Sequence, residues 1–230
     1  MPSRHPIALA TLVLVALAGC DQGSGIVGLG GSNGAAVRFV NAIGTPVDLT
    51  ANGQVIGGSG HVAAGAFTSC LQVNPATVAL GIRPSGQPTD LPGFAPTFLV
   101  GQGYTVIVFE GETGTTQAVV MSDDFTPTSG LGGLRVFDAA PGTGSLDVYV
   151  TAPGEPLTVP STASIGFGGG TPFFDVNPGT SQVRFTVATT PVLFFDAGQV
   201  TLLPDSRTTL VLAPPAAGTS QPNALLLPGC

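Results

Sequence analysis

The fold is decided by the stretch VRFVNA, residues 37–42, which returns later in the chain as LRVFDA, residues 134–139. Both copies read as one short apolar strand with an Arg at its second position. Repeated blocks in a fixed order indicate an internal duplication. Three more pairs follow in the same order: VDL (47–49) with LDV (146–148), VNP (73–75) with VNP (176–178), and YTVIV (104–108) with RTTLV (207–211).

The repeated blocks have the periodicity of strands. In residues 182–187 and 78–83 apolar side chains fall on alternate positions, as a half-buried strand requires. Turn dipeptides recur between such runs, and no stretch after residue 20 sustains a helical period. The pattern predicts about seven strands in the first copy: 37–42, 46–51, 54–57, 67–73, 77–83, 94–100 and 104–110, with 117–121 as a further edge.

These patterns predict an all-β protein with two tandem Ig-like antiparallel β-sandwich domains. Domain 1 is expected over residues 36–122 and domain 2 over 134–213. Residues 123–133 are expected to link them, and residues 214–230 read as a Pro-rich C-terminal tail.

Composition narrows the function classes. The 230 residues include 34 Gly and 21 Pro, and only 8% of the residues are charged. The chain has six Arg, no Lys and 13 acidic residues, which gives a net charge of −7. A helical bundle would need many more Ala, Glu, Lys and Leu residues. No basic patch is present to neutralise phosphates, so nucleic acid is not an expected partner.

The N-terminus reads as an export signal. A short basic start precedes an uncharged apolar run over residues 7–18, which is too short to span a bilayer as a helix. The run ends in LAGC, residues 17–20, which resembles the lipobox of bacterial lipoproteins. The resemblance implies that residues 1–19 are removed, that Cys20 is lipidated, and that the protein is held at a membrane on the periplasmic or extracellular side of the cell envelope.

Residues 20–35 then carry the lipidated Cys20 and a Gly-rich stretch, which predicts a flexible tether between the lipid and domain 1.

The second copy also resembles a known family. The stretches LRVFDAAP (134–141) and LDVYV (146–150), and GYTV (103–106) in the first copy, are similar to the bacterial domain of unknown function 4397. The resemblance implies a secreted or envelope β-sandwich, usually in tandem, without an established activity. A turn His typical of that family is replaced here by Asn41 and Asp138.

Catalytic groups are scarce. His61 is the only His after residue 20, and neither His nor Cys clusters in a metal-binding pattern. Asp123 and Asp124 could offer oxygens to Ca²⁺, but a full site needs about six to eight ligands, so we expect a solvated acidic turn instead. We therefore expect no enzyme, cofactor or metal. The alternative is an envelope carbohydrate-active hydrolase that uses carboxylates, which would need a sheltered Asp/Glu pair.

Two Arg–Asp pairs recur at equivalent positions, Arg38 with Asp48 and Arg135 with Asp147. They predict a cross-strand ion pair in each domain, which we favour over a ligand site.

Domain 2 is rich in Phe, with two adjacent pairs at residues 173–174 and 194–195. Adjacent strand residues point to opposite faces, so at least one ring of each pair is expected to face outward. Packing between the domains would cover such rings, and an aromatic patch for a glycan or protein is the alternative. The candidate binding residues are Phe167, Phe173 and Phe195, and the candidate partners are an envelope protein or polysaccharide.

Two cysteines remain after lipidation, Cys70 and Cys230. Side-chain alternation places Phe67, Leu71 and Val73 inward and Cys70 outward. An exported protein meets an oxidising compartment, so we expect a Cys70–Cys230 disulfide that folds the tail back onto domain 1. Two free thiols are the alternative.

Overall fold

The computed structural model describes residues 34–56 and 60–230, and Cys20 and the signal sequence lie outside them. The described chain is all-β, with sixteen strands and no helix, which confirms the predicted β-sandwich class. Each domain packs two four-stranded sheets against each other around its own apolar core.

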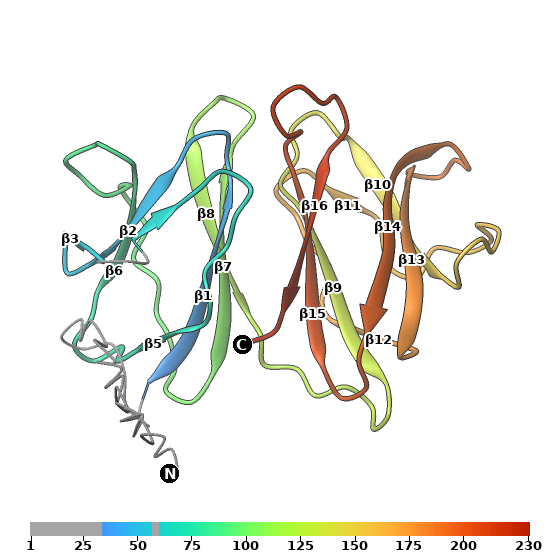
Figure 1. The fold of residues 1–230 in the computed structure, drawn as a ribbon, viewed down its shortest axis with the longest axis horizontal. Helices are drawn as coiled ribbons and strands as arrows, with labels where there is room; N and C mark the ends of the chain where they lie inside the picture. The colour runs from blue at the N-terminus through green and yellow to red at the C-terminus, as the bar shows by residue number, and fades with distance from the viewer. Residues whose placement is uncertain (1–33, 57–59) are drawn as a thin grey trace, which may run out of the picture.

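Domain 1 holds strands β1 to β8 (Figure 1). Its inner sheet, the one nearer domain 2, has the order β5-β1-β7-β8, and its outer sheet pairs β2 with β3, β4 and β6. The inner strands are β1 (Ala35–Ala42), β5 (Leu71–Val73), β7 (Gly103–Glu110) and β8 (Thr116–Ser122); the outer strands are β2 (Val47–Ala51), β3 (Gln54–Val55), β4 (His61–Val62) and β6 (Leu80–Pro84).

Domain 2 repeats this plan with β9 to β16. Its inner sheet has the order β12-β9-β15-β16 and its outer sheet β11-β10-β13-β14. The inner strands are β9 (Gly132–Asp138), β12 (Phe174–Val176), β15 (Arg207–Ala213) and β16 (Asn223–Pro228); the outer strands are β10 (Ser145–Thr151), β11 (Ile165–Gly166), β13 (Gly179–Val187) and β14 (Leu193–Leu202).

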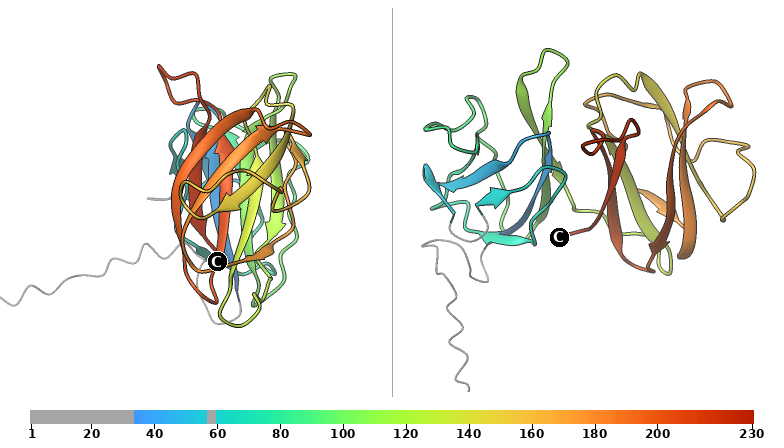
Figure 2. Two further views of the ribbon diagram at one scale, coloured as in Figure 1. Left: turned by 90° about the vertical axis from the view of Figure 1, so that its right-hand side faces the viewer. Right: turned by 45° about the horizontal axis from the view of Figure 1, so that its top comes forward.

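The two inner sheets pack face to face, so the molecule is a stack of four layers (Figures 1 and 2). A third apolar cluster fills the space between the domains and draws side chains from both. Its buried members include Ile107 and Phe109 of β7, Phe137 of β9, and Leu225 and Leu227 of β16. Each inner sheet is therefore apolar on both faces, which explains why β1, β7, β9 and β15 are almost continuously buried.

Each inner sheet contains one parallel pair, which corrects the expectation of purely antiparallel sheets. β1 pairs with β7 in parallel, and β9 pairs with β15 in the same way. Asn41 in β1 lies beside Val108, and Asp138 in β9 lies beside Leu212. The remaining pairs in both domains are antiparallel.

The registers also correct the internal alignment by one residue. Ala36 of β1 pairs with Gly103, and its equivalent Gly133 of β9 pairs with Arg207. Residues 103–107 are therefore the counterpart of 207–211, whereas the sequence comparison aligned 104–108 with them. Apolar residues occupy most positions in both strands, so a shift of one position left the pattern nearly unchanged.

Three predicted segments differ in the structure. Residues 94–100 form no strand, because Pro96 interrupts the run; Phe98 nevertheless packs into the domain core. Residues 214–230 are not a separate tail, because β16 pairs with β15 along its whole length and belongs to domain 2. The predicted strand 67–73 is shorter, because β5 starts at Leu71. The expectation that Phe67 faces inward was wrong, since its side chain lies before the strand and is 42% exposed.

Candidate functional site: the junction between the two domains

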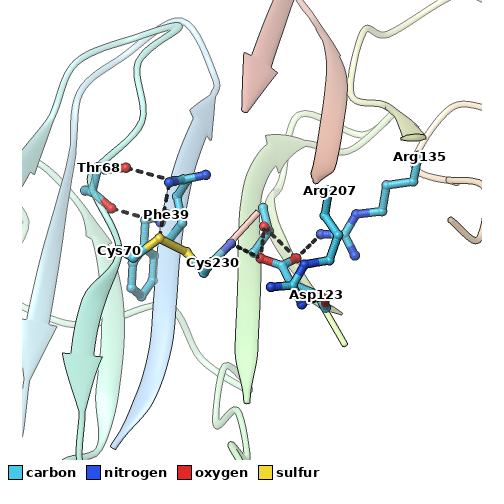
Figure 3. The surroundings of a disulfide bond; sticks show 9 residues. Phe39, Thr68, Cys70, Asp123, Arg135, Arg207 and Cys230 are labelled. Atoms are coloured by element: carbon cyan, nitrogen blue, oxygen red, sulfur yellow. Dashed lines mark hydrogen bonds and ion pairs between the residues drawn. A yellow bond between two sulfur atoms is a disulfide. The ribbon is translucent and has the colours of Figure 1, made fainter. Parts of the chain in front are cut away.

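A disulfide joins the two domains, as the sequence predicted. Cys70 and Cys230 are bonded with an S–S distance of 2.10 Å and a Cα–Cα distance of 5.8 Å, across 160 positions of sequence. Cys70 directly precedes β5 of domain 1, and Cys230 follows β16 of domain 2 (Figure 3). The bridge lies beside a cluster of polar groups that also come from both domains.

The centre of that cluster is Asp123, which is fully buried. The Thr105 hydroxyl donates to its carboxylate at 3.0 and 3.1 Å, and the backbone N–H of Cys230 donates at 3.0 Å. The Arg135 guanidinium forms a buried ion pair with it. Arg207 donates to its backbone oxygen at 2.6 Å (Figure 3). Asp123 is therefore a structural anchor, and the expectation of a solvated acidic turn was wrong for it.

Arg135 of β9 is satisfied on every side. Its Nε donates to the Thr209 hydroxyl at 2.9 Å and its Nη1 to the backbone oxygen of Ser122 at 2.6 Å. Its guanidinium lies 4.4 Å from the ring centre of Phe173. Burial lowers the pKa of Arg135, and the charge of Asp123 opposes that effect. This arrangement keeps a buried cation compensated.

Arg38 occupies the equivalent position in β1 but has no carboxylate bonded to it within the described residues. Its Nε donates to the backbone oxygen of Thr68 at 3.1 Å and its Nη2 to the Cys70 sulfur at 3.2 Å. Its Nη1 is buried without a partner among the described residues. Burial lowers the pKa of Arg38, against the opposing charge of Asp123.

The predicted Arg–Asp ion pairs are not formed, since β1 and β2 belong to different sheets, as do β9 and β10. Asp48 instead accepts from the Ser85 hydroxyl at 2.7 Å, and Asp147 accepts from the Thr189 N–H at 2.8 Å. The five Arg residues of the described chain all lie in strands, and three gather at the junction. They are Arg38 (β1), Arg83 (β6), Arg135 (β9), Arg184 (β13) and Arg207 (β15).

Ser85, His61 and Asp48 come together in domain 1, although not as a nucleophile–base–acid relay. Ser85 Oγ lies 3.0 Å and Asp48 Oδ1 lies 3.1 Å from the same nitrogen, His61 Nδ1. A relay needs the acid and the nucleophile on opposite ring nitrogens. The Ser85 hydrogen bond lowers the pKa of Asp48, and burial opposes it. The geometry describes a polar surface cluster with an exposed His.

The three candidate Phe residues lie in separate places. Phe167 packs into the interdomain cluster, 5.8 Å from the Phe109 ring centre. Phe173 stacks on Phe125 at 5.1 Å beside Arg135. Phe195 packs on the domain 2 core, 6.2 Å from Phe185. They form no single patch.

We expected one ring of the adjacent pair Phe194 and Phe195 to face outward, and this was wrong, because both rings pack against the domain 2 core. The register of β13 and β14 shifts where Phe185 faces Phe195 and Thr186 faces Leu193. Such a β-bulge turns two successive side chains toward one face.

Asn41 is the penultimate residue of β1 and Asp138 is the last residue of β9, and both are fully buried. The Asn41 amide donates at 2.9 Å to the backbone oxygens of Thr45 and Val62. Asp138 accepts from the Ala140 N–H at 3.0 Å and the Thr143 hydroxyl at 2.5 Å. Burial raises the pKa of Asp138, and these two hydrogen bonds oppose the shift. The positions therefore shape the turn after each strand.

The described residues contain no group of three or more His, Cys, Asp or Glu that could hold a metal ion. No helix among them is long and apolar enough to cross a membrane.

Sequence reasoning missed the roles of Asp123 and Arg207. The one available signal was position, because Asp123 lies two residues after the predicted edge strand 117–121. Gly229 is its counterpart in domain 2: the Asp123 N–H bonds to the Gly103 oxygen, and the Gly229 N–H bonds to the Arg207 oxygen. The two copies therefore differ at this position, where the domains meet.

Fold and junction together define a tandem β-sandwich protein whose two repeats share a core and a disulfide. The sequence profile of the Domain of unknown function (DUF4397) matches twice, at residues 35–149 and 132–228. The chain therefore belongs to the DUF4397 family. No curated protein matches the sequence.

Proposed function

We propose that this chain is a bacterial cell-envelope lipoprotein, anchored in a membrane through Cys20, that acts as a non-catalytic binding or structural module. Its two sandwiches would present loops to an envelope protein or polysaccharide. The observation that carries the proposal is the disulfide between the domains, because such bonds persist in exported proteins. The lipobox-like stretch at residues 17–20 supports the same compartment.

Rigidity supports a presenting role. The disulfide, the buried Asp123–Arg135 pair and the shared apolar cluster all hold the two domains in one arrangement. A fixed arrangement reduces the entropy lost when loops of both domains bind one partner. The absence of a catalytic role is part of the proposal, and the shared-nitrogen geometry at His61 is consistent with it.

Intact mass of the protein extracted from membranes tests the anchor. We expect the mass of residues 20–230 plus acyl chains, with two thiol labels gained only after reduction. A mass without acyl chains, or a mass showing that the chain begins before Cys20, would overturn the anchor. A Cys20→Ala variant is the control, because it removes the acylated thiol and leaves the described domains unchanged.

A further inference from the structure

A cavity of about 440 Å³ opens at the end of domain 2, between its inner and outer sheets. It lies where β12 ends and β13 begins, at the lower edge of domain 2 in Figure 1. Its apolar walls include Leu131, Val150 and Phe174, and its polar walls include Asn177, Thr180 and Ser181. This volume falls within the range of small-ligand sites.

The cavity arises from a difference between the two copies. Ala51 pairs with Leu80 in domain 1, and Val150 pairs with Val183 in domain 2, which makes Val78 and Ser181 equivalent. Val78 is buried and fills the core of domain 1. Ser181 instead pairs with Val200 of β14, a strand without a counterpart in the described part of domain 1. Pairing with β14 thus replaces a core side chain by a small hydroxyl.

The two copies also differ in the hydrogen bonding of an Asn side-chain amide next to the cavity. Asn74 and Asn177 belong to the repeated Val-Asn-Pro block, and the Asn74 side chain accepts from the Ala76 N–H at 3.0 Å in a turn. In domain 2 the equivalent of Ala76 is Gly179, whose φ of 114° takes the chain straight into β13. Asn177 makes no side-chain hydrogen bond within the described chain, so its amide is available at the cavity.

The polar groups of the cavity define its ligand. The side chains of Asn177, Thr180 and Ser181 are uncommitted within the part of the chain that the structure describes, and all are neutral. Among the described residues, Asp175 is the one charged member of the lining. Both its oxygens are engaged by Thr128, from the N–H at 3.1 Å and from the hydroxyl at 2.5 Å. No uncommitted charge of the described residues therefore lines the cavity.

We propose that this cavity binds a sugar unit of a neutral polysaccharide. A pyranose offers hydroxyls at its rim, which both donate and accept, and an apolar C–H face. The side-chain amide and hydroxyls of the cavity can hydrogen-bond to the sugar hydroxyls, and the half-buried ring of Phe174 can pack against the apolar C–H face. The inference rests on the proposed binding function and names its ligand class.

Affinity electrophoresis tests it with the full chain in a detergent that has no sugar headgroup. The gels contain dextran, mannan, galactan or mixed β-glucan as neutral probes, and alginate as an anionic one. We expect at least one neutral probe to retard the protein. Ser181→Val, which restores the residue type of domain 1, and Asn177→Ala should each weaken retardation at least tenfold. Ser145→Val, at the exposed far end of β10, should leave it unchanged.

Retardation by none of the neutral probes, or retardation that persists in Ser181→Val, would overturn the proposal. A single-Trp variant gives a second reading, because the chain contains no Trp. Phe174→Trp fluorescence should change on titration with the retarding neutral polysaccharide, and an unchanged spectrum would count against this cavity. Acylation at Cys20 is measured separately, so failure here leaves the anchor proposal standing.

Discussion

Asp123 is a residue whose loss would disturb both domains together. Replacing it by Ala leaves Arg135 buried without its carboxylate and removes the acceptor of the Cys230 N–H. Breaking a buried pair on one side costs about 3–5 kcal/mol. We expect that loss of unfolding free energy for Asp123→Ala in urea denaturation.

The neighbouring Asp124→Ala is the matched control, because Asp124 is exposed and its carboxylate accepts a single long bond from the described residues, from Gln102 at 3.4 Å. It should change the unfolding free energy by less than about 0.5 kcal/mol. Equal effects of the two substitutions would contradict the anchoring role of Asp123.

Asp138 makes stability depend on pH. Its pKa is raised in the folded state by burial, so the protonated acid is favoured there. Its contribution is present at low pH and is lost as pH rises through the folded pKa. Asp138→Asn carries no charge at any pH, so it should gain about 1 kcal/mol over the native chain at pH 8 and less at pH 4. Melting temperatures at both pH values measure this.

The reciprocal change in domain 1 is Asn41→Asp. It removes the donors to the Thr45 and Val62 oxygens and buries a new carboxyl. We expect a loss of about 2–4 kcal/mol, larger at pH 8 than at pH 4.

For the Asp138→Asn variant, a gain in stability that is the same at both pH values would show that Asp138 does not titrate as described.

At the scale of elements, β16 is the last strand of domain 2 and contributes side chains to the interdomain cluster. Its faces alternate, with Leu227 fully buried in the interdomain cluster and Leu226 37% exposed. Leu227→Ala should cost about 3–5 kcal/mol, and Leu226→Ala about 1 kcal/mol or less. Urea denaturation of the two variants compares them on one strand. Similar costs would mean that β16 does not close the interdomain core.

The sequence predicted most strands because the local alternation of apolar residues is sufficient to indicate them. It did not predict β16 as part of the sheet, since Pro-rich residues 214–222 suggested a tail and pairing with β15 is a tertiary property. The cystine was predictable from compartment and count. The Asp123–Arg135 pair was not, because it joins a linker residue to β9, and the bulge at 194–195 broke the alternation rule.

At the scale of the whole molecule, the disulfide and the shared core act on the same interface. Cross-linking across 160 positions removes about 5 kcal/mol of chain entropy from the unfolded state in the loop-closure model. Reduction should therefore lower the urea midpoint markedly. Cys70→Ala with Cys230→Ala should reproduce the reduced midpoint and show no further response to reductant. A midpoint that reductant leaves unchanged in the native chain would contradict a stabilising bridge.

The placement of every described Arg within a strand has a practical consequence. Trypsin cleaves only after Lys or Arg, and this chain has no Lys. A protease needs several residues of extended, accessible backbone, which strands held in a ladder do not offer. Loops that would ordinarily be nicked first carry no tryptic bond in the described chain. Cleavage of the described domains by trypsin therefore requires the strands that carry Arg to open. The rate of that cleavage measures how often the protein unfolds.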